Sequence, residues 1–268
     1  MLQLDNPIIV KLGGSVITHK GSSPPRINDE HLGRIAEELV ACNNPLIVVL
    51  GGGAHGHQAA HKHGFGTPDS PSSRLLAGIP DIRHNMSILA SRVEVEMNNH
   101  GIPSVVFSPF TFVTLRDNLI DDFPIGIIKK TLETGAAVII HGDVCFDETN
   151  SVSILSGDTI AVYLAQKLVA KAVFIGTNVD GVLEEDPQIN PRARYIPLID
   201  RSNMSRVLIH TGPSSETDVT GGMAKKIHEL LELSNLSVDI AVFNLLIPSR
   251  LTGLLKEEPT VCTRIRVS

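Results

Sequence analysis

Short runs of hydrophobic residues, many of them β-branched, alternate along the chain with segments in which apolar residues recur every three or four positions. The four clearest runs, each bounded by glycine or a polar turn, span residues 8–12, 46–50, 137–140 and 172–176. Continuous apolar runs of this length are typical of strands buried on both faces of a parallel sheet. We therefore predict strands at these four places.

The segments between these runs predict amphipathic helices. Within residues 29–42, Leu32 and Leu39 fall on one stripe, and Asn28 or Asp29 offers an N-cap. Similar patterns occur over residues 82–98, 125–134, 157–169 and 220–234, whereas residues 20–26 and 64–73 are rich in Gly, Pro and Ser and predict loops. The alternation of predicted strands and helices along the chain indicates an α/β fold, namely an α/β/α sandwich with a largely parallel central sheet.

Composition narrows the class of protein. Hydrophobic residues make up 42% of the 268 residues and charged residues 19%, a balance that supports a packed core. The net charge of -6 provides no basic surface for nucleic acid or anionic lipid, and no apolar run is long enough to cross a bilayer. Because Cys42, Cys145 and Cys262 are scattered, we expect a reduced cytoplasmic protein.

Glycine follows three of the predicted strands, in KLGGS (11–15), LGGGAHGH (50–57) and HGDV (141–144). Ligands of open α/β sheets bind beyond the carboxyl ends of the strands, where glycine exposes backbone N–H groups to an anion. Lys11 would add a fixed positive charge, although its place before the glycines differs from a Walker A motif. Each loop is also compatible with an ordinary tight turn.

The triple glycine is followed by closely spaced histidines. His57 and His61 lie four residues apart and could share one helix face, which is compatible with zinc. No cysteine or carboxylate completes a ligand set at a convincing spacing. We therefore favour an anion-binding role for His57 and assign no metal ligands.

Three later motifs combine charge with glycine. Asp158 begins the helix pattern of SGDTIAVYLAQKL, Asp180 belongs to TNVDGVL, and Gly222 precedes Lys225 and Lys226 in DVTGGMAKKI. Each aspartate is also compatible with a cap or turn, and the lysines with a solvated face. Two lysines early in a helix oppose the helix dipole, so a nearby anion would explain them.

In this order, K-x-G-G-S, G-G-G, S-G-D, D-G and G-G-M-x-x-K resemble the motifs of the amino acid kinases over about residues 8–227. Within that superfamily, Lys20 and the Gly-His pair of GGGAHGH resemble the isopentenyl phosphate kinases. The chain departs from that pattern at Leu50, where the family often has His, and at His19, where it often has Asp. Residues 74–86 match only loosely the segment that encloses the isoprenoid tail.

The resemblance implies ATP- and Mg²⁺-dependent phosphorylation of isopentenyl phosphate to isopentenyl diphosphate, in an alternative mevalonate route, by a homodimer. It implies one domain over residues 1–268, with an acceptor-binding lobe at about 1–150 and a nucleotide-binding lobe at about 151–268. The implied catalytic residues are Lys11, Lys20, His57 and Asp158; the acceptor-binding residues are Gly53, His57 and Gly142; the nucleotide-binding residues are Lys11, Gly13, Gly14, Ser15, Ala54, Asp180, Gly181, Gly222 and Lys226.

Phosphoryl transfer needs placement and charge neutralisation, which lysines, amides and Mg²⁺ supply. A phosphate-monoester acceptor is largely dianionic at neutral pH and needs no general base, so His57 suits it better than a carboxylate would. Two alternatives remain open: a fosfomycin-type or other small phosphate or phosphonate kinase, and a non-catalytic nucleotide-binding regulator on the same fold.

Overall fold

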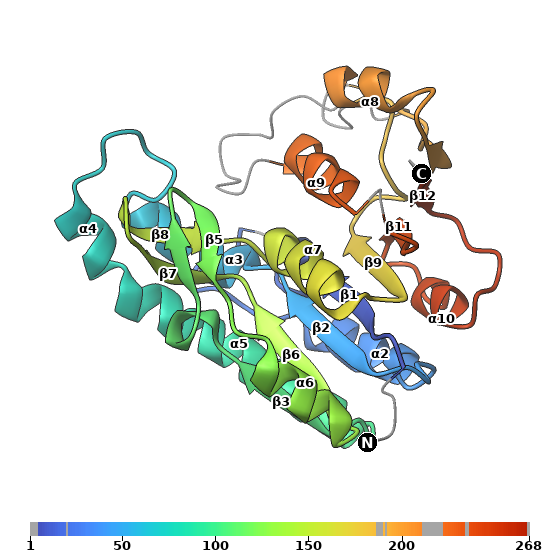
Figure 1. Cartoon of the computed structure of the whole chain (residues 1–268), viewed down its shortest axis with the longest axis horizontal. Helices are drawn as coiled ribbons and strands as arrows, with labels where there is room; N and C mark the ends of the chain where they lie inside the picture. Colours follow the sequence, from blue (N-terminus) through green and yellow to red (C-terminus); the bar gives the residue numbers. More distant parts are fainter. Residues whose placement is uncertain are drawn as a thin grey trace.

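The central feature is a twisted sheet, seen in a computed structural model that describes residues 5–19, 21–185, 190, 192–210, 222–233 and 236–266. Within these ranges eight strands lie in the order β10-β12-β11-β9-β1-β2-β6-β3 (Figure 1). All neighbouring pairs among β11, β9, β1, β2, β6 and β3 are parallel, whereas β12 runs antiparallel to β11. The predicted fold class is confirmed.

The four strands predicted from apolar runs are confirmed and form the middle of this sheet. They are β1 (Ile8–Leu12), β2 (Leu46–Leu50), β6 (Ala137–His141) and β9 (Ala172–Thr177), and every residue in them is buried. The flanking strands are β3 (Ser104–Phe107), β10 (Leu198–Ile199), β11 (Asp239–Asn244) and β12 (Thr263–Ile265).

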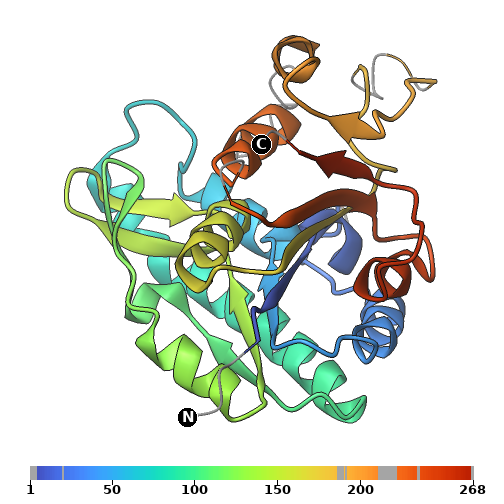
Figure 2. The same cartoon turned by 45° about the vertical axis from the view of Figure 1, so that its right-hand side comes forward.

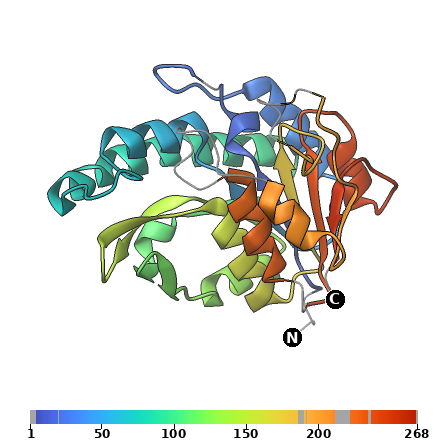
Figure 3. The ribbon, with the colours of Figure 1, turned by 90° about the horizontal axis from the view of Figure 1, so that it is seen from above.

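Helices cover both faces of the sheet, as Figure 3 shows in the view from above. One face carries α2 (Asp29–Leu39), α5 (Ile79–Asn99) and α10 (Arg250–Leu255); the other carries α6 (Gly126–Glu133), α7 (Gly157–Leu168) and α9 (Gly222–Leu231). Successive strand residues point to opposite faces, so Val10 packs in one apolar cluster and Ile9 in the other.

The five predicted helices are all present, and Asn28 is the N-cap of α2, with its side chain accepting a hydrogen bond from His31 N. Shorter elements are α1 (Gly14–Ile17), α3 (Gly53–Lys62), α4 (Ser72–Ala77), α8 (Met204–His210) and a 3₁₀ turn (Pro109–Thr111). The predicted loop over residues 64–73 is two residues too long, because α4 begins at Ser72.

A second, four-stranded sheet was not predicted from the sequence. Its order is β5-β4-β7-β8, comprising β4 (Thr114–Arg116), β5 (Leu119–Asp122), β7 (Asp143–Asp147) and β8 (Ser151–Leu155). It lies at the end of the molecule away from β11 and β12, as the rotated view of Figure 2 also shows. β7 begins immediately after Gly142, so this sheet adjoins one of the glycine loops.

Within the described ranges, no helix is long and apolar enough to span a membrane.

Candidate phosphate-binding site

The glycine loops after β1 and β2 pack directly on each other. These strands are parallel neighbours in the sheet, so their carboxyl ends share one edge. A Cβ atom on Gly14 would collide with the backbone nitrogen of Gly53, and one on Gly51 would lie 2.9 Å from Gly14 N. Because these glycines have no side chain, the two backbones approach each other to a separation that no other residue would permit.

Two further glycines join this edge. Gly142, which follows β6, donates its N–H to Leu50 O at 3.0 Å. Gly157 begins α7 after β8, and a Cβ atom there would lie 2.9 Å from the same Leu50 oxygen. The loops that contain Gly14, Gly53 and Gly142 therefore converge beside the N-terminus of α7, a place where backbone N–H groups and the helix dipole favour an anion.

Thr18 braces the first two loops. Its hydroxyl donates to Gly14 O at 2.7 Å and accepts from Ala54 N at 3.0 Å. Gly53 adopts a left-handed backbone conformation with φ of 49°, and a Cβ atom there would collide with the Thr18 hydroxyl. Thr18 was missed in the sequence analysis because nothing in its local pattern distinguishes it from other loop threonines.

Two lysines flank one carboxylate at the centre of the site. Lys11 Nζ lies 3.1 Å from Asp158 Oδ1, and Lys226 Nζ lies 2.6 Å from Asp158 Oδ2. The three side chains are only 9–13% exposed. Lys11 comes from β1, Asp158 from the first turn of α7 and Lys226 from α9, so three distant segments meet here.

The cluster carries one more positive than negative charge in a buried setting. Burial lowers the pKa of Lys11 to about 8, against the attraction of Asp158 and with the help of repulsion from Lys226. Burial alone would raise the pKa of Asp158, but the Lys11 and Lys226 ammoniums outweigh it and hold that pKa well below its usual range. The excess positive charge and the adjacent N-terminus of α7 favour a polyanion at this place.

The histidines after the triple glycine differ in their environments. His57 is half-buried in α3, one turn after Gly53. His55 is 3% exposed, its Nδ1 has no hydrogen-bond partner among the described residues, and burial lowers its pKa. His57 thus lies one turn into the helix that follows the triple glycine, and its role in binding the acceptor stays a prediction, whereas His55 is a buried polar group.

Asp180 and Gly181 lie in the loop after β9, on the β11 side of the site. Arg250 donates to Asp180 Oδ1 at 2.6 Å and Asn244 donates at 3.1 Å. Burial raises the pKa of Asp180, but these hydrogen bonds and the Arg250 charge outweigh it and lower that pKa overall. Gly181 packs against Thr263, with φ of 157°. Arg250 and Asn244 carry no sequence signal that links them to this loop.

The end of β9 packs against the first glycine loop, which begins directly after the strand that carries Lys11. A Cβ atom on Gly13 would lie 2.5 Å from Gly176 O at the end of β9. Ser15 is exposed at the start of α1, and Gly222 begins α9. The predicted site residue Lys20 lies outside the described residues.

The residues at this edge fit a nucleotide better than a dedicated metal centre. Within the described ranges, no group of three or more His, Cys, Asp or Glu side chains could hold a metal ion. Asp158 is neutralised by two ammoniums and is therefore a poor cation ligand. A divalent cation here would be held mainly by the phosphates of the nucleotide, as Mg²⁺ usually is.

Comparisons with known proteins agree with this chemistry. A sequence model of the amino acid kinase family matches residues 6–244. The isopentenyl phosphate kinase of Methanothermobacter thermautotrophicus is 34% identical over 264 residues, covering 96% of this chain and 98% of the relative. That of Methanocaldococcus jannaschii is 34% identical over 230 residues, covering 82% and 84%.

Solved structures give the same result. The chain superposes on a crystal structure of isopentenyl phosphate kinase with a TM-score of 0.82 and 30% identity, covering 97% of this chain and 99% of that one. It superposes on UMP kinase from Ureaplasma parvum with a TM-score of 0.65 and 20% identity, covering 98% and 100%, a likeness of fold alone.

Proposed function

We propose a function from the premise that the chain belongs to the amino acid kinase family. In this proposal the protein transfers the γ-phosphoryl group of ATP to isopentenyl phosphate, forming isopentenyl diphosphate and ADP. The observation that carries the proposal is the Lys11–Asp158–Lys226 cluster beside the glycine loops, one of which leads into His57. The near full-length similarity to isopentenyl phosphate kinases supports the choice of acceptor.

In the proposed reaction, a phosphate oxygen of the acceptor attacks the γ-phosphorus of ATP in line. A new P–O bond forms as the bond from that phosphorus to the β–γ bridging oxygen breaks, and ADP leaves with the electron pair. The acceptor phosphate is largely dianionic at neutral pH, since its second pKa is about 6. No side chain has to remove a proton, which agrees with a site whose carboxylate is already paired with lysines.

Lys11 and Lys226 would neutralise the ATP phosphates, with Lys20 stabilising the transferring group. Asp158 would hold the two ammoniums in place before the nucleotide arrives, because it contacts both. Mg²⁺ bound by the phosphates would neutralise charge as it builds up in the transition state. Preorganised positive charge of this kind lowers the barrier because it need not reorganise during transfer.

The other predicted residues divide between the two substrates. His57, with Gly53 and Gly142, would hold the acceptor phosphate. Contacts to the nucleotide would come from Gly13, Gly14, Ser15, Ala54, Asp180, Gly181 and Gly222. Of these nucleotide contacts, Asp180, Gly181 and Gly222 would come from the proposed nucleotide lobe at about 151–268, and the others would reach the nucleotide from the proposed acceptor lobe at about 1–150.

We further propose a homodimer in the cytoplasm that supplies isoprenoid biosynthesis. Support for assembly comes from α5, where Ile88 and Val95 are exposed two turns apart, and from Val105, which is exposed on the edge strand β3 that α5 contacts. Sedimentation of the protein with and without Val95→Asp would test this surface, because a charge there should shift a dimer to monomer.

The proposed activity is tested by ADP release from purified protein with Mg-ATP and a panel of acceptors. The panel contains isopentenyl phosphate, dimethylallyl phosphate, longer prenyl phosphates, fosfomycin and N-acetylglutamate. We expect selective turnover of the five-carbon phosphates. Turnover of fosfomycin alone would support a resistance-type kinase, and ATP binding without any turnover would support a non-catalytic regulator; either result would overturn the proposal.

A further inference from the structure

Among the described residues, an ion pair and a hydrogen bond join helix α9 to the start of α7, and the hydrogen bond involves no predicted site residue. The first is the ion pair of Lys226 with Asp158. The second joins the next turn of α9 to the next residue of α7: Thr159 Oγ1 donates to Glu229 Oε1 at 2.8 Å. Residues three apart share one face of a helix, so Lys226 and Glu229 reach α7 side by side.

The second contact belongs to a chain of hydrogen bonds at the N-cap of α7. Ser156 Oγ accepts from Thr159 N at 3.0 Å and lies 2.8 Å from Thr159 Oγ1. Because the single Thr159 hydroxyl proton goes to Glu229, the Ser156 hydroxyl is the donor to Thr159. The direction of the chain is thus fixed, and Glu229 is its terminal acceptor.

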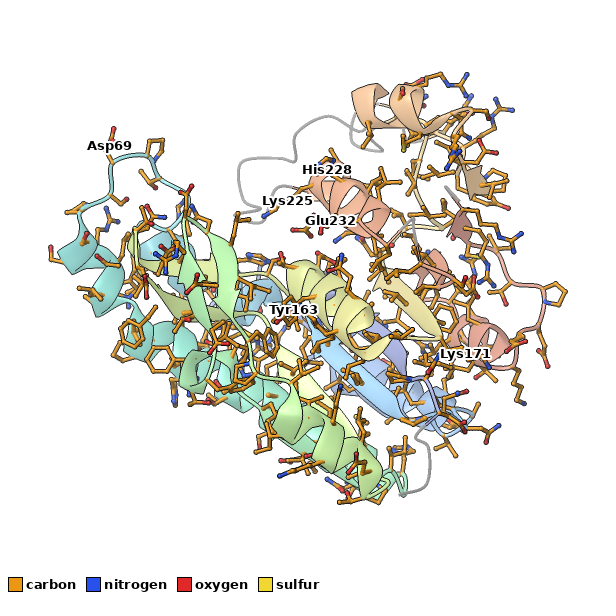
Figure 4. The ribbon with its side chains drawn as sticks, in the orientation of Figure 1. Asp69, Tyr163, Lys171, Lys225, His228 and Glu232 are labelled. Atoms are coloured by element: carbon orange, nitrogen blue, oxygen red, sulfur yellow. The ribbon has the colours of Figure 1, made fainter. Side chains whose placement is uncertain are left out.

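The Glu229 carboxylate stands in a setting that an incidental surface glutamate would not share. Its side chain is 12% exposed, and Lys225 Nζ lies 3.8 Å away. Burial raises the pKa of Glu229, against the hydrogen bond from Thr159 and the charge of Lys225. In contrast, Glu232, the next glutamate along the chain, is exposed; Figure 4 shows Lys225, His228 and Glu232 at α9 beside α7.

The two contacts respond differently when a polyphosphate enters. The incoming anion would compete with Asp158 for the charge of the Lys226 ammonium and would so weaken the first contact. The Thr159–Glu229 hydrogen bond involves neither that ammonium nor Asp158, so the competition would leave it in place. It would therefore keep α9 on α7 and the ammonium where it is.

We propose that Glu229, acting through Thr159, is a positioning residue for Lys226 in the kinase reaction. It touches no substrate; it holds α9 on the first turn of α7 so that the Lys226 ammonium stays within reach of both Asp158 and the ATP phosphates. The catalytic part of this inference rests on the proposed function.

The test compares Glu229→Ala, Glu229→Gln and Thr159→Val, with Glu232→Ala as the matched control on the same segment. Removing a hydrogen bond to a charged group should lower a rate or binding constant that depends on it about tenfold. We expect Glu229→Ala and Thr159→Val each to lower kcat/KM for ATP about tenfold and to leave KM for the acceptor within about twofold. Glu229→Gln, which still accepts from Thr159, should restore most of the activity, and Glu232→Ala should match the wild type.

A second set of variants separates positioning from general loss of structure. In a Lys226→Ala background, Glu229→Ala should change kcat/KM for ATP by less than about twofold, because contacts that act through one group are not additive. Equal losses in both backgrounds, or full activity of Glu229→Ala, would overturn the proposal.

Calorimetry of ATP binding without acceptor, together with hydrogen exchange of the α9 amides, keeps this test separate from the identity of the acceptor. Glu229→Ala should weaken ATP binding and speed exchange in α9 even if isopentenyl phosphate is not turned over. If Glu229→Ala leaves the ATP affinity and the hydrogen exchange of α9 unchanged, the positioning role is wrong whatever the substrate. If the wild type turns over no acceptor, only the proposed function is wrong.

Discussion

The Lys11 ammonium lies 3.1 Å from the Asp158 carboxylate, although 147 residues of sequence separate them. Lys226 lies 2.6 Å from Asp158 Oδ2, the oxygen to which Lys11 also donates a hydrogen bond at 3.2 Å. Taking charges out of water is costly, and three partly paired charges contribute little net stability compared with apolar packing. A buried cluster of this kind fits the chemistry that it prepares, since preorganised ammoniums can receive phosphate groups without rearrangement.

Asp158→Asn should leave two buried ammoniums without a counter-ion. Breaking a buried charge pair costs about 3–5 kcal/mol, so the free energy of unfolding should fall by an amount near the low end of that range. Because ATP brings its own negative charge, we expect it to raise the melting temperature of the variant more than that of the wild type. Thermal melts with and without Mg-ATP measure this, and an equal ATP shift in both proteins would contradict it.

At alkaline pH, the activity of the enzyme should depend on the ionisation of Lys11. Its pKa is depressed from 10.5 to about 8 in the folded protein, so above about pH 8 the folded site loses charge while the unfolded chain keeps it. We expect kcat/KM for ATP to fall as the pH rises through about 8, since that ratio reports the free enzyme. The same group should make folding more favourable between about pH 8 and 10.5, where the unfolded chain binds more protons.

Lys11→Arg is the matched variant for this pH profile. A guanidinium stays charged over the whole accessible pH range. The decline in kcat/KM should therefore shift to higher pH, even if the maximal activity is lower. In the wild type, the decline in kcat should also lie at higher pH than that in kcat/KM, because bound phosphate favours the charged lysine. An unchanged decline in Lys11→Arg would assign it to another group.

His57→Gln and His57→Ala test the acceptor side of the proposal. If His57 holds the acceptor phosphate, both variants should bind ATP with unchanged affinity but lose most transfer, with Gln retaining more because it can still donate a hydrogen bond. Calorimetry gives the ATP affinity and steady-state kinetics gives KM for isopentenyl phosphate. Normal kcat and KM in His57→Ala would remove His57 from the site.

The central strands could be predicted because both of their faces are buried. β2 is an unbroken apolar run and β1 is interrupted only by Lys11, and in a chain of this composition a short run of that kind favours a strand at the centre of a parallel sheet. The second sheet is different: β4 has one buried residue, Leu115, between exposed Thr114 and Arg116, and β5 has no buried residue at all. Strands this short and this polar look like loops until their partners are known.

The same limit applies to the site. Glycine-rich loops and the lysines and aspartates beside them have local signatures, so Lys11, Asp158 and Lys226 could be singled out from the sequence. Their mutual contacts depend on the sheet order and on the packing of α9 against α7, which no local pattern contains. Thr18 and Glu229 therefore became visible only through the atoms that they contact.

The close approach of the first two glycine loops makes Gly14→Ala the sharpest structural test. A Cβ atom there would collide with Gly53, and backbone on both sides leaves no flexible group to move aside. We expect loss of ATP binding and a lower melting temperature. Gly33→Ala is the matched control: no atom lies within 4 Å of its added Cβ, and within α2 alanine should add roughly 0.5–1 kcal/mol of stability. Calorimetry and thermal melts of both variants decide the point, because a Gly14→Ala protein that binds ATP normally would show that the loops can separate without harm to the site.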